Sequence, residues 1–128
     1  MGDDLYYYSR PERLMNLLRQ VPDLQVIAAH FGGWRAWAHS YECPLPSCVL
    51  YDTSSTLPMI PRDMVLRMLD RFGPERFLFG TDFPMWSPKE ELARFLALGL
   101  GEDVNEKILY GNFMKLFDLH DEDETEGA

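Results

Sequence analysis

Two side chains capable of proton transfer follow short apolar runs in this sequence. His30 comes after the run 24–29 and precedes two glycines, and Asp82 follows the run 76–80. A third apolar run between them is followed by the polar segment 52–55, which is rich in hydroxyl groups. An imidazole and a carboxylate brought close together can transfer protons. The pattern therefore predicts a candidate functional site at the ends of the apolar runs.

Each of these residues also has a simpler explanation. A histidine after an apolar run can be a purely structural hydrogen-bonding group, Asp52 can be a turn former, and Asp82 can cap the following helix. Ser87 lies closer to that helix and is the better cap, which leaves Asp82 available. The glycines after His30 favour function there, because glycine permits a tight turn or the close approach of a ligand.

The elements that must position these side chains alternate between helical and strand patterns. Apolar residues at helical spacing, with proline and glycine at the boundaries, predict four helices: residues 11–20, 61–72, 88–96 and 104–119. Short apolar runs bounded by polar residues predict three strands that are buried on both faces: residues 24–29, 48–51 and 76–80. Residues 34–46 are expected to form a loop or a short helix. In the last helix, five apolar residues are expected to face inward: Ile108, Leu109, Phe113, Leu116 and Phe117.

The order of the elements predicts an α/β architecture. Strands that alternate with helices imply a parallel sheet with right-handed crossovers. The carboxyl ends of its strands share one edge, where α/β proteins bind their ligands. We therefore expect His30, the segment 52–55 and Asp82 to converge there. A flavodoxin-like domain is a weaker alternative, because the sequence lacks a glycine-rich phosphate loop.

Charge and composition exclude several classes of partner. The chain has 21 acidic and 12 basic residues and a formal charge of -9, which argues against nucleic acid and against an anionic membrane surface. No apolar run approaches the ~20 residues of a membrane span, and no signal peptide is visible. Cys43 and Cys48, the only cysteines, are expected to be reduced thiols in a cytoplasmic protein. We predict one unit over residues 1–119 and an acidic disordered tail over residues 120–128.

Three segments of the chain resemble a known enzyme family. Residues 22–33, PDLQVIAAHFGG, resemble the sixth-strand segment of the amidohydrolase-related (amidohydrolase 2) family, which includes aminocarboxymuconate-semialdehyde decarboxylase-like enzymes. Residues 77–84, FLFGTDFP, resemble its eighth-strand segment, and residues 108–117, ILYGNFMKLF, resemble its closing helix. The likeness covers residues 9–119 in the family's order and spacing.

The resemblance implies a fold and an activity. The fold is a partial (β/α)8 TIM barrel, in which the three strands correspond to the sixth to eighth strands, with flanking helices. The activity is metal-dependent hydrolysis or decarboxylation of a small carboxylate- or amide-bearing substrate by metal-activated water, with zinc as the expected divalent metal. Asp82 matches a catalytic aspartate that is also a metal ligand, and His30 matches a catalytic histidine that touches the substrate or orients the water. The expected substrate contacts are Trp34, Arg35, Asp52 and Trp86.

The chain departs from the family pattern at the metal site. The family also uses a His-x-His pair on its first strand and usually a histidine on its fifth, whereas the first histidine here is His30. Zinc takes about four ligands, so we expect the chain alone to bind no metal stably and to be inactive. The alternative is a non-catalytic half-barrel that acts as an assembly or complementation module. Its unpaired sheet edges would then favour self-association or pairing with an N-terminal half-barrel.

Overall fold

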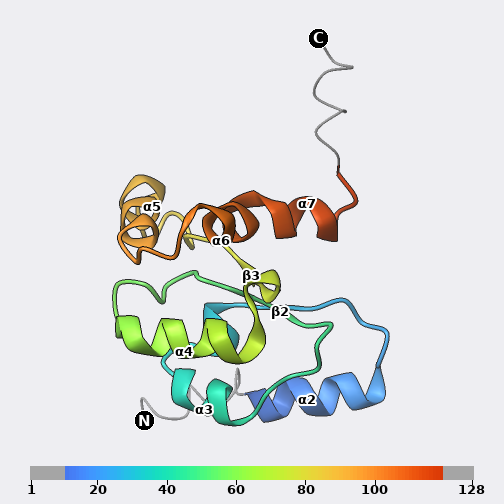
Figure 1. The fold of residues 1–128 in the computed structure, drawn as a ribbon. Helices are drawn as coiled ribbons and strands as arrows, with labels where there is room; N and C mark the ends of the chain where they lie inside the picture. The colour runs from blue at the N-terminus through green and yellow to red at the C-terminus, as the bar shows by residue number, and fades with distance from the viewer. Residues whose placement is uncertain (1–10, 120–128) are drawn as a thin grey trace.

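The centre of the fold is a parallel sheet of three strands in the order β1-β2-β3 (Figure 1). The strands are β1 (Ile27–Ala28), β2 (Leu50–Asp52) and β3 (Phe77–Leu78). This computed structural model describes residues 11–119, so the predicted tail and the first ten residues of the predicted unit lie outside the described residues. The predicted parallel sheet is confirmed.

Each strand is shorter than the apolar run that predicted it. The first run was expected to pair over residues 24–29, yet only Ile27 and Ala28 are ladder residues. At its carboxyl end the strand stops because the backbone turns out of the extended conformation at His30 (φ 60°) and Phe31 (φ 54°). Single hydrogen bonds still extend the pairing beyond the ladders: Leu50 N donates to Val26 O at 3.1 Å, and Thr53 N donates to Leu78 O at 3.1 Å.

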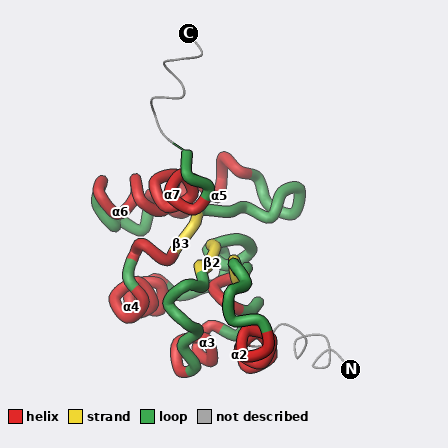
Figure 2. Tube along the Cα trace, turned by 90° about the vertical axis from the view of Figure 1, so that its right-hand side faces the viewer, coloured by secondary structure: helices red, strands yellow, loops and turns green. Residues whose placement is uncertain are grey.

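Helices lie on both sides of the sheet in Figures 1 and 2. One side carries α2 (Pro11–Gln20), α3 (Trp37–Glu42) and α4 (Arg62–Phe72). The other carries α5 (Pro88–Leu96), α6 (Glu102–Glu106) and α7 (Asn112–Leu116). The predicted helices 11–20 and 88–96 are confirmed with the same bounds, and the helix predicted from Pro61 begins one residue later, with Pro61 as its N-cap.

The last helix differs from the prediction in two respects. It is divided into α6, a π-helical segment, η4 (Lys107–Gly111), and α7, and it ends at Leu116 rather than at residue 119. Its expected inward face is wrong at Phe113 and Phe117, which are 47% and 55% exposed. Ile108 is buried as expected, and Leu109 and Leu116 are partly buried.

A hydrogen-bonding side chain determines this rotation of the last helix. Nδ2 of Asn112 donates to Pro74 O at 2.8 Å and to Phe77 O at 2.7 Å. Ile108 lies four residues earlier on the same face, so Asn112 and Ile108 point to the sheet together. Phe113 and Phe117 consequently turn away and pack on each other, with their ring centroids 4.7 Å apart.

Much of the core lies between the sheet and α4, and the same buried cluster extends to α2 at Leu18 and to α5 at Phe95. Register places Ala28, Tyr51 and Phe77 side by side on one face of the sheet. The Tyr51 ring stacks on Phe72 of α4 at 5.2 Å and on Phe77 at 5.5 Å, between ring centroids. Such a pair contributes about 1 kcal/mol beyond the area that it buries. The aromatic rings therefore hold the strands at a defined distance from α4.

None of the described helices combines the length and the apolarity that crossing a lipid bilayer requires.

Candidate active site

The carboxyl ends of the three strands converge, as predicted, and hydrogen bonds join them. His30 N, after β1, donates to Asp52 Oδ1 at the end of β2 (2.9 Å). The hydroxyl of Ser55, after β2, donates to Asp82 Oδ2, after β3 (2.6 Å). Since Ser54 also contacts His30, the adjacent residues Ser54 and Ser55 connect the two predicted catalytic side chains.

The surroundings of His30 define the proton arrangement of its ring. Nδ1 lies 2.8 Å from the backbone oxygen of Ser54 and 2.9 Å from its hydroxyl oxygen. A backbone carbonyl can only accept a hydrogen bond, so Nδ1 of the neutral ring carries the hydrogen. Nε2 then presents a lone pair, and no hydrogen bond from residues 11–119 is found at this atom. His30 can therefore accept a proton or bind a cation through Nε2.

Asp52 organises the turn after β2. Its Oδ1 accepts hydrogen bonds from His30 N (2.9 Å), Ser54 N (3.0 Å) and Ser54 Oγ (2.6 Å). The bond to the backbone two residues ahead is an Asx turn, which matches the turn-former interpretation of Asp52. The geometry thus favours a positioning role for this carboxylate, and the predicted substrate contact stays a prediction.

Asp82 is exposed at the same edge of the sheet. Its Oδ2 accepts the Ser55 hydroxyl, and within the described part of the chain no hydrogen bond reaches Oδ1. Ser87 Oγ caps α5 by accepting from Glu90 N at 3.4 Å, so Asp82 is not the helix cap, as the sequence predicted. One carboxylate oxygen of Asp82 is therefore available to a ligand.

Left-handed backbone conformations are concentrated at this edge. His30, Ser55 and Asp82 have φ values of 60°, 49° and 58°. A non-glycine residue in this region costs on the order of 1–3 kcal/mol and tends to be found at functional sites. The turns at all three strand ends thus share an uncommon backbone conformation, which supports a functional role for this edge.

The predicted aromatic and cationic contacts fall into two groups. The Arg35 guanidinium lies 5.0 Å from the Trp34 ring centroid and is exposed, so it can still meet an anionic ligand. Trp86, by contrast, uses its indole N–H for Ser55, to which Nε1 donates at 2.9 Å. The sequence predicted that the hydroxyl-rich segment 52–55 lies at this edge, but it assigned no role to Ser54 or Ser55 individually.

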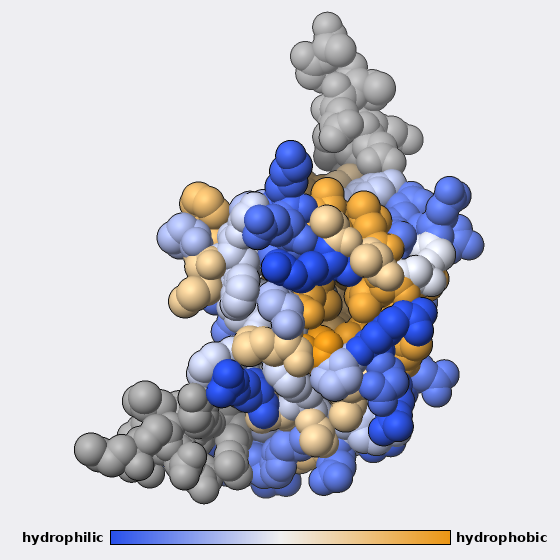
Figure 3. All heavy atoms as spheres, turned by 90° about the vertical axis from the view of Figure 1, so that its left-hand side faces the viewer, coloured by the Kyte–Doolittle hydropathy of each residue, from blue (hydrophilic) through white to orange (hydrophobic). Residues whose placement is uncertain are grey.

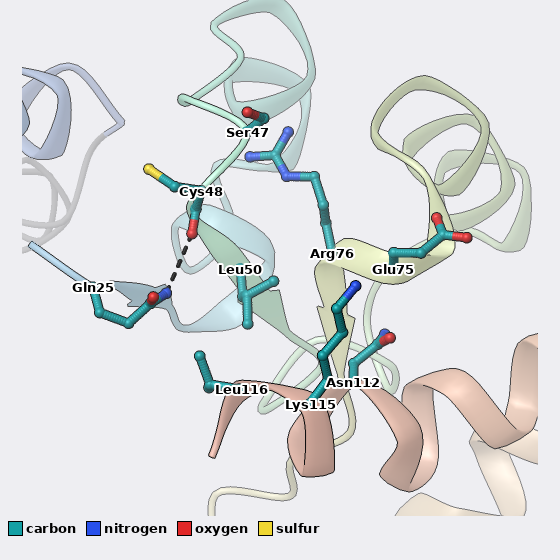
Figure 4. A pocket seen from close by; sticks show the side chains of 9 residues that line it. All are labelled: Gln25, Ser47, Cys48, Leu50, Glu75, Arg76, Asn112, Lys115 and Leu116. Carbon is teal, nitrogen blue, oxygen red and sulfur yellow. Dashed lines mark hydrogen bonds between the residues drawn. The ribbon is translucent and has the colours of Figure 1, made fainter. Parts of the chain in front are cut away.

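A cavity of about 400 Å³ lies at the opposite edge of the sheet, near the amino ends of the strands (Figure 4). Its lining includes Gln25, Cys48, Arg76, Asn112 and Lys115. Arg76 is engaged there by backbone oxygens, since Nε donates to Val49 O at 3.0 Å and Nη2 to Pro46 O at 2.8 Å. This cavity does not include His30 or Asp82, and its arginine serves to tie loops together.

Two pKa shifts arise from one ion pair beside this cavity. Lys107 Nζ donates to Glu75 Oε1 at 2.9 Å. The hydrogen bond lowers the pKa of Glu75 and raises the pKa of Lys107, because each charge favours the other. Both side chains are largely exposed, so the pair contributes little to stability.

The residues present do not complete a metal site. Within residues 11–119, no group of three or more His, Cys, Asp or Glu side chains is placed to hold a metal ion. Asp82 Oδ1 and His30 Nε2 are two candidate donors, whereas zinc takes about four ligands. Any metal bound at this edge therefore needs further ligands.

Comparison with solved structures supports the fold. An uncharacterised TIM-barrel protein from Bordetella bronchiseptica is 29% identical with a TM-score of 0.69, over 88% of this chain and 40% of that protein. A manganese-bound dihydroxybenzoic acid decarboxylase from Polaromonas sp. JS666, solved with the inhibitor 2-nitroresorcinol, is 20% identical with a TM-score of 0.63, over 81% and 36%. A zinc-bound amidohydrolase from Burkholderia multivorans is 19% identical with a TM-score of 0.60, over 80% and 50%. None of the curated protein sequences matches this chain.

These comparisons also define how much of a barrel is present. The chain spans half or less of the length of each of the three structures. Its three parallel strands form an open sheet. Together with the flanking helices they correspond to part of a TIM barrel. The sequence model of the amidohydrolase family matches residues 7–119, which is most of the chain. The resemblance read from the sequence is confirmed, and the chain belongs to the amidohydrolase family.

Proposed function

We propose that this chain supplies the His30–Asp82 section of an active site that hydrolyses or decarboxylates a small carboxylate- or amide-bearing substrate. The observation that carries the proposal is the pairing of Ser54 with His30 and of Ser55 with Asp82 at the carboxyl edge of the sheet. This pairing leaves one atom with a free lone pair on each side chain, Nε2 of His30 and Oδ1 of Asp82, without a partner among residues 11–119. A proton acceptor and a carboxylate oxygen at one edge suit the activation of a water molecule.

The proposed reaction depends on a divalent metal. Zinc is our expectation, and one of the similar structures contains zinc whereas another contains manganese. A bound metal would lower the pKa of its water toward ~7. Asp82 Oδ1 would be one ligand, His30 Nε2 is a second candidate, and the remaining ligands would come from outside the described residues. We therefore propose that residues 11–119 alone bind metal weakly and turn over no substrate.

Arg35 is the proposed anchor for an anionic substrate. Its exposed guanidinium presents a planar set of donors that matches a carboxylate, and Trp34 supports it from one side. The free thiols of Cys43 and Cys48 suit the proposed cytoplasmic location.

The test uses the protein as it occurs in its native cells, purified together with any polypeptide that stays bound to it. Metal content is measured by mass spectrometry, and turnover is measured on a panel of aromatic carboxylates and cyclic amides or esters. Asp82→Asn should lower both bound metal and turnover. Glu90→Gln also replaces a carboxylate by an amide, at an exposed residue eight positions later, and should alter neither. Near-normal turnover by Asp82→Asn would remove this residue from the mechanism.

A second candidate function is that of a half-barrel assembly module, and exposed apolar side chains favour it. Ile27 on the edge strand β1 is 42% exposed, although strands of this fold are normally covered on both faces. Figure 3 shows hydrophobic side chains gathered in a hollow on one side of the molecule. We propose that an N-terminal half-barrel pairs with this edge, because unpaired strand edges bind further strands.

The assembly role is tested separately from catalysis. Light scattering should find the isolated chain self-associated, and Ile27→Lys should reduce the association, since a charge on an edge strand opposes pairing. Asp82→Asn should leave it unchanged. A monodisperse monomer at high concentration would count against the assembly role without bearing on the catalytic one.

A further inference from the structure

The hydroxyl of Ser55 lies between a hydrogen-bond donor, the indole of Trp86, and a hydrogen-bond acceptor, the carboxylate of Asp82. Ser55 is buried, with 6% of the residue exposed, so its hydroxyl has little access to water. The indole Nε1 of Trp86 lies 2.9 Å from Ser55 Oγ, and Asp82 Oδ2 lies 2.6 Å from the same oxygen. All three hydrogen-bonding groups come from the carboxyl edge of the sheet or from the turn that follows it.

The chemistry of the partners determines the direction of both hydrogen bonds. An indole N–H can only donate, and an ionised carboxylate can only accept. Ser55 Oγ must therefore accept from Trp86 and point its own hydrogen at Asp82. A hydrogen bond to a charged acceptor is stronger than a neutral one, so the bond to Asp82 is the stronger of the two.

Trp86 is held in turn by residues of α5. The Arg94 guanidinium lies 5.8 Å from the Trp86 ring centroid, and it pairs with Glu91, whose side chain is fully buried. Glu91 is one helical turn before Arg94, so α5 carries both members of the pair. The indole plane is thus supported on one side by a cation that a buried carboxylate keeps in place.

We propose that Ser55, oriented by Trp86, is a positioning residue for Asp82. It binds Oδ2 and so leaves Oδ1 as the oxygen that faces the substrate or a cation. The functional importance of Asp82 rests on the function proposed above, whereas the link from Trp86 through Ser55 to Asp82 is a property of this chain alone. The link can therefore be tested without activity.

The experiment observes the indole N–H signals of the full chain by two-dimensional ¹H–¹⁵N NMR. The chain has three tryptophans, and Trp86→Phe assigns the relevant signal. Ser55→Ala should shift the Trp86 indole signal, because the acceptor is removed, while the signals of Trp34 and Trp37 stay in place. Ser55→Gly, which removes the hydroxyl without straining the backbone at φ 49°, should shift the Trp86 signal in the same way.

Asp82→Asn provides the decisive comparison. It should also shift the Trp86 indole signal, because the neutral amide polarises the Ser55 hydroxyl less than a carboxylate does. Glu90→Gln removes one negative charge at a similar sequence distance from Trp86 and should leave the signal unchanged. The proposal is overturned if Asp82→Asn has no effect on Trp86, or if Glu90→Gln has the same effect.

Misfolding is recognised in the same spectra. If Ser55→Ala collapses the dispersion of all three indole signals, the variant has lost its fold, and Asp82→Asn and Ser55→Gly decide the question. A chain that passes this test but lacks activity in its native complex would contradict the proposed function and leave the positioning role intact.

Discussion

The backbone N–H of His30 donates to Oδ1 of Asp52 at 2.9 Å, although the two residues are 22 positions apart in the chain. The same oxygen also accepts hydrogen bonds from the backbone N–H and the hydroxyl of Ser54. A single carboxylate oxygen thus fixes the turn after β1 and the turn after β2 against each other.

Replacing Asp52 by alanine should therefore destabilise the protein. Three donors at a half-buried position would lose their acceptor. Each group that finds no other partner costs about 2 kcal/mol. Asp52→Asn retains an oxygen and should cost less. Urea denaturation measures both changes, with Asp70→Ala on the exposed face of α4 as the control. Equal stability of Asp52→Ala and Asp70→Ala would show that the turn does not depend on this carboxylate.

His30→Asn should reduce turnover of the complete enzyme by roughly 10²- to 10⁴-fold, the usual contribution of a general acid or base. Asparagine tolerates the left-handed backbone at φ 60° better than most residues, so the fold should persist. Metal content should fall much less than turnover. A proportional loss of metal would instead identify His30 as a ligand, and His39→Asn serves as the matched histidine control.

Gly32→Ala should destabilise the fold because a methyl group has no room there. An added Cβ would lie 2.8 Å from Ser40 Oγ and 3.0 Å from Tyr51 Cε1, at a backbone φ of +92°. Gly99 is the matched control, since it also has a positive φ (+68°) but nothing within 4 Å of an added Cβ. Thermal unfolding of the two alanine variants separates the clash, about 1–3 kcal/mol for overpacking, from the backbone strain that both share. Similar melting temperatures would contradict the close packing at Gly32.

Stability should fall in alkaline solution because of Tyr51. Burial raises the pKa of Tyr51 above the usual 10.0. The unfolded chain therefore ionises at this tyrosine before the folded chain does, and stability decreases as the pH rises above about 10. Tyr51→Phe should weaken this dependence.

The same variant should cost little at neutral pH, because the buried Tyr51 hydroxyl makes no well-aligned hydrogen bond within residues 11–119, although the Leu45 backbone and the Arg76 guanidinium lie close enough to oppose the rise of its pKa. Denaturation of both proteins at pH 7 and pH 11 provides the comparison. An unchanged pH dependence in Tyr51→Phe would mean that another group controls alkaline unfolding.

Several features were predictable because their causes are local. Helix α5 was predicted with its observed bounds because Ser87 and Pro88 mark its start and its apolar residues recur at helical spacing. The convergence of His30 and Asp82 followed from the position of each after an apolar run, since parallel strands end at the same edge. The family was recognisable from the same segments.

Only the tertiary structure decided which neighbours those side chains have. The contact of Ser55 with Asp82 spans 27 positions, and that of Trp86 with Ser55 spans 31. Likewise, Asn112 rotates the last helix by binding carbonyl oxygens 38 and 35 positions away, which turns Phe113 and Phe117 outward against the apolar pattern. Periodicity reports which face of a helix is apolar, but hydrogen bonds between distant segments determine which face meets the sheet.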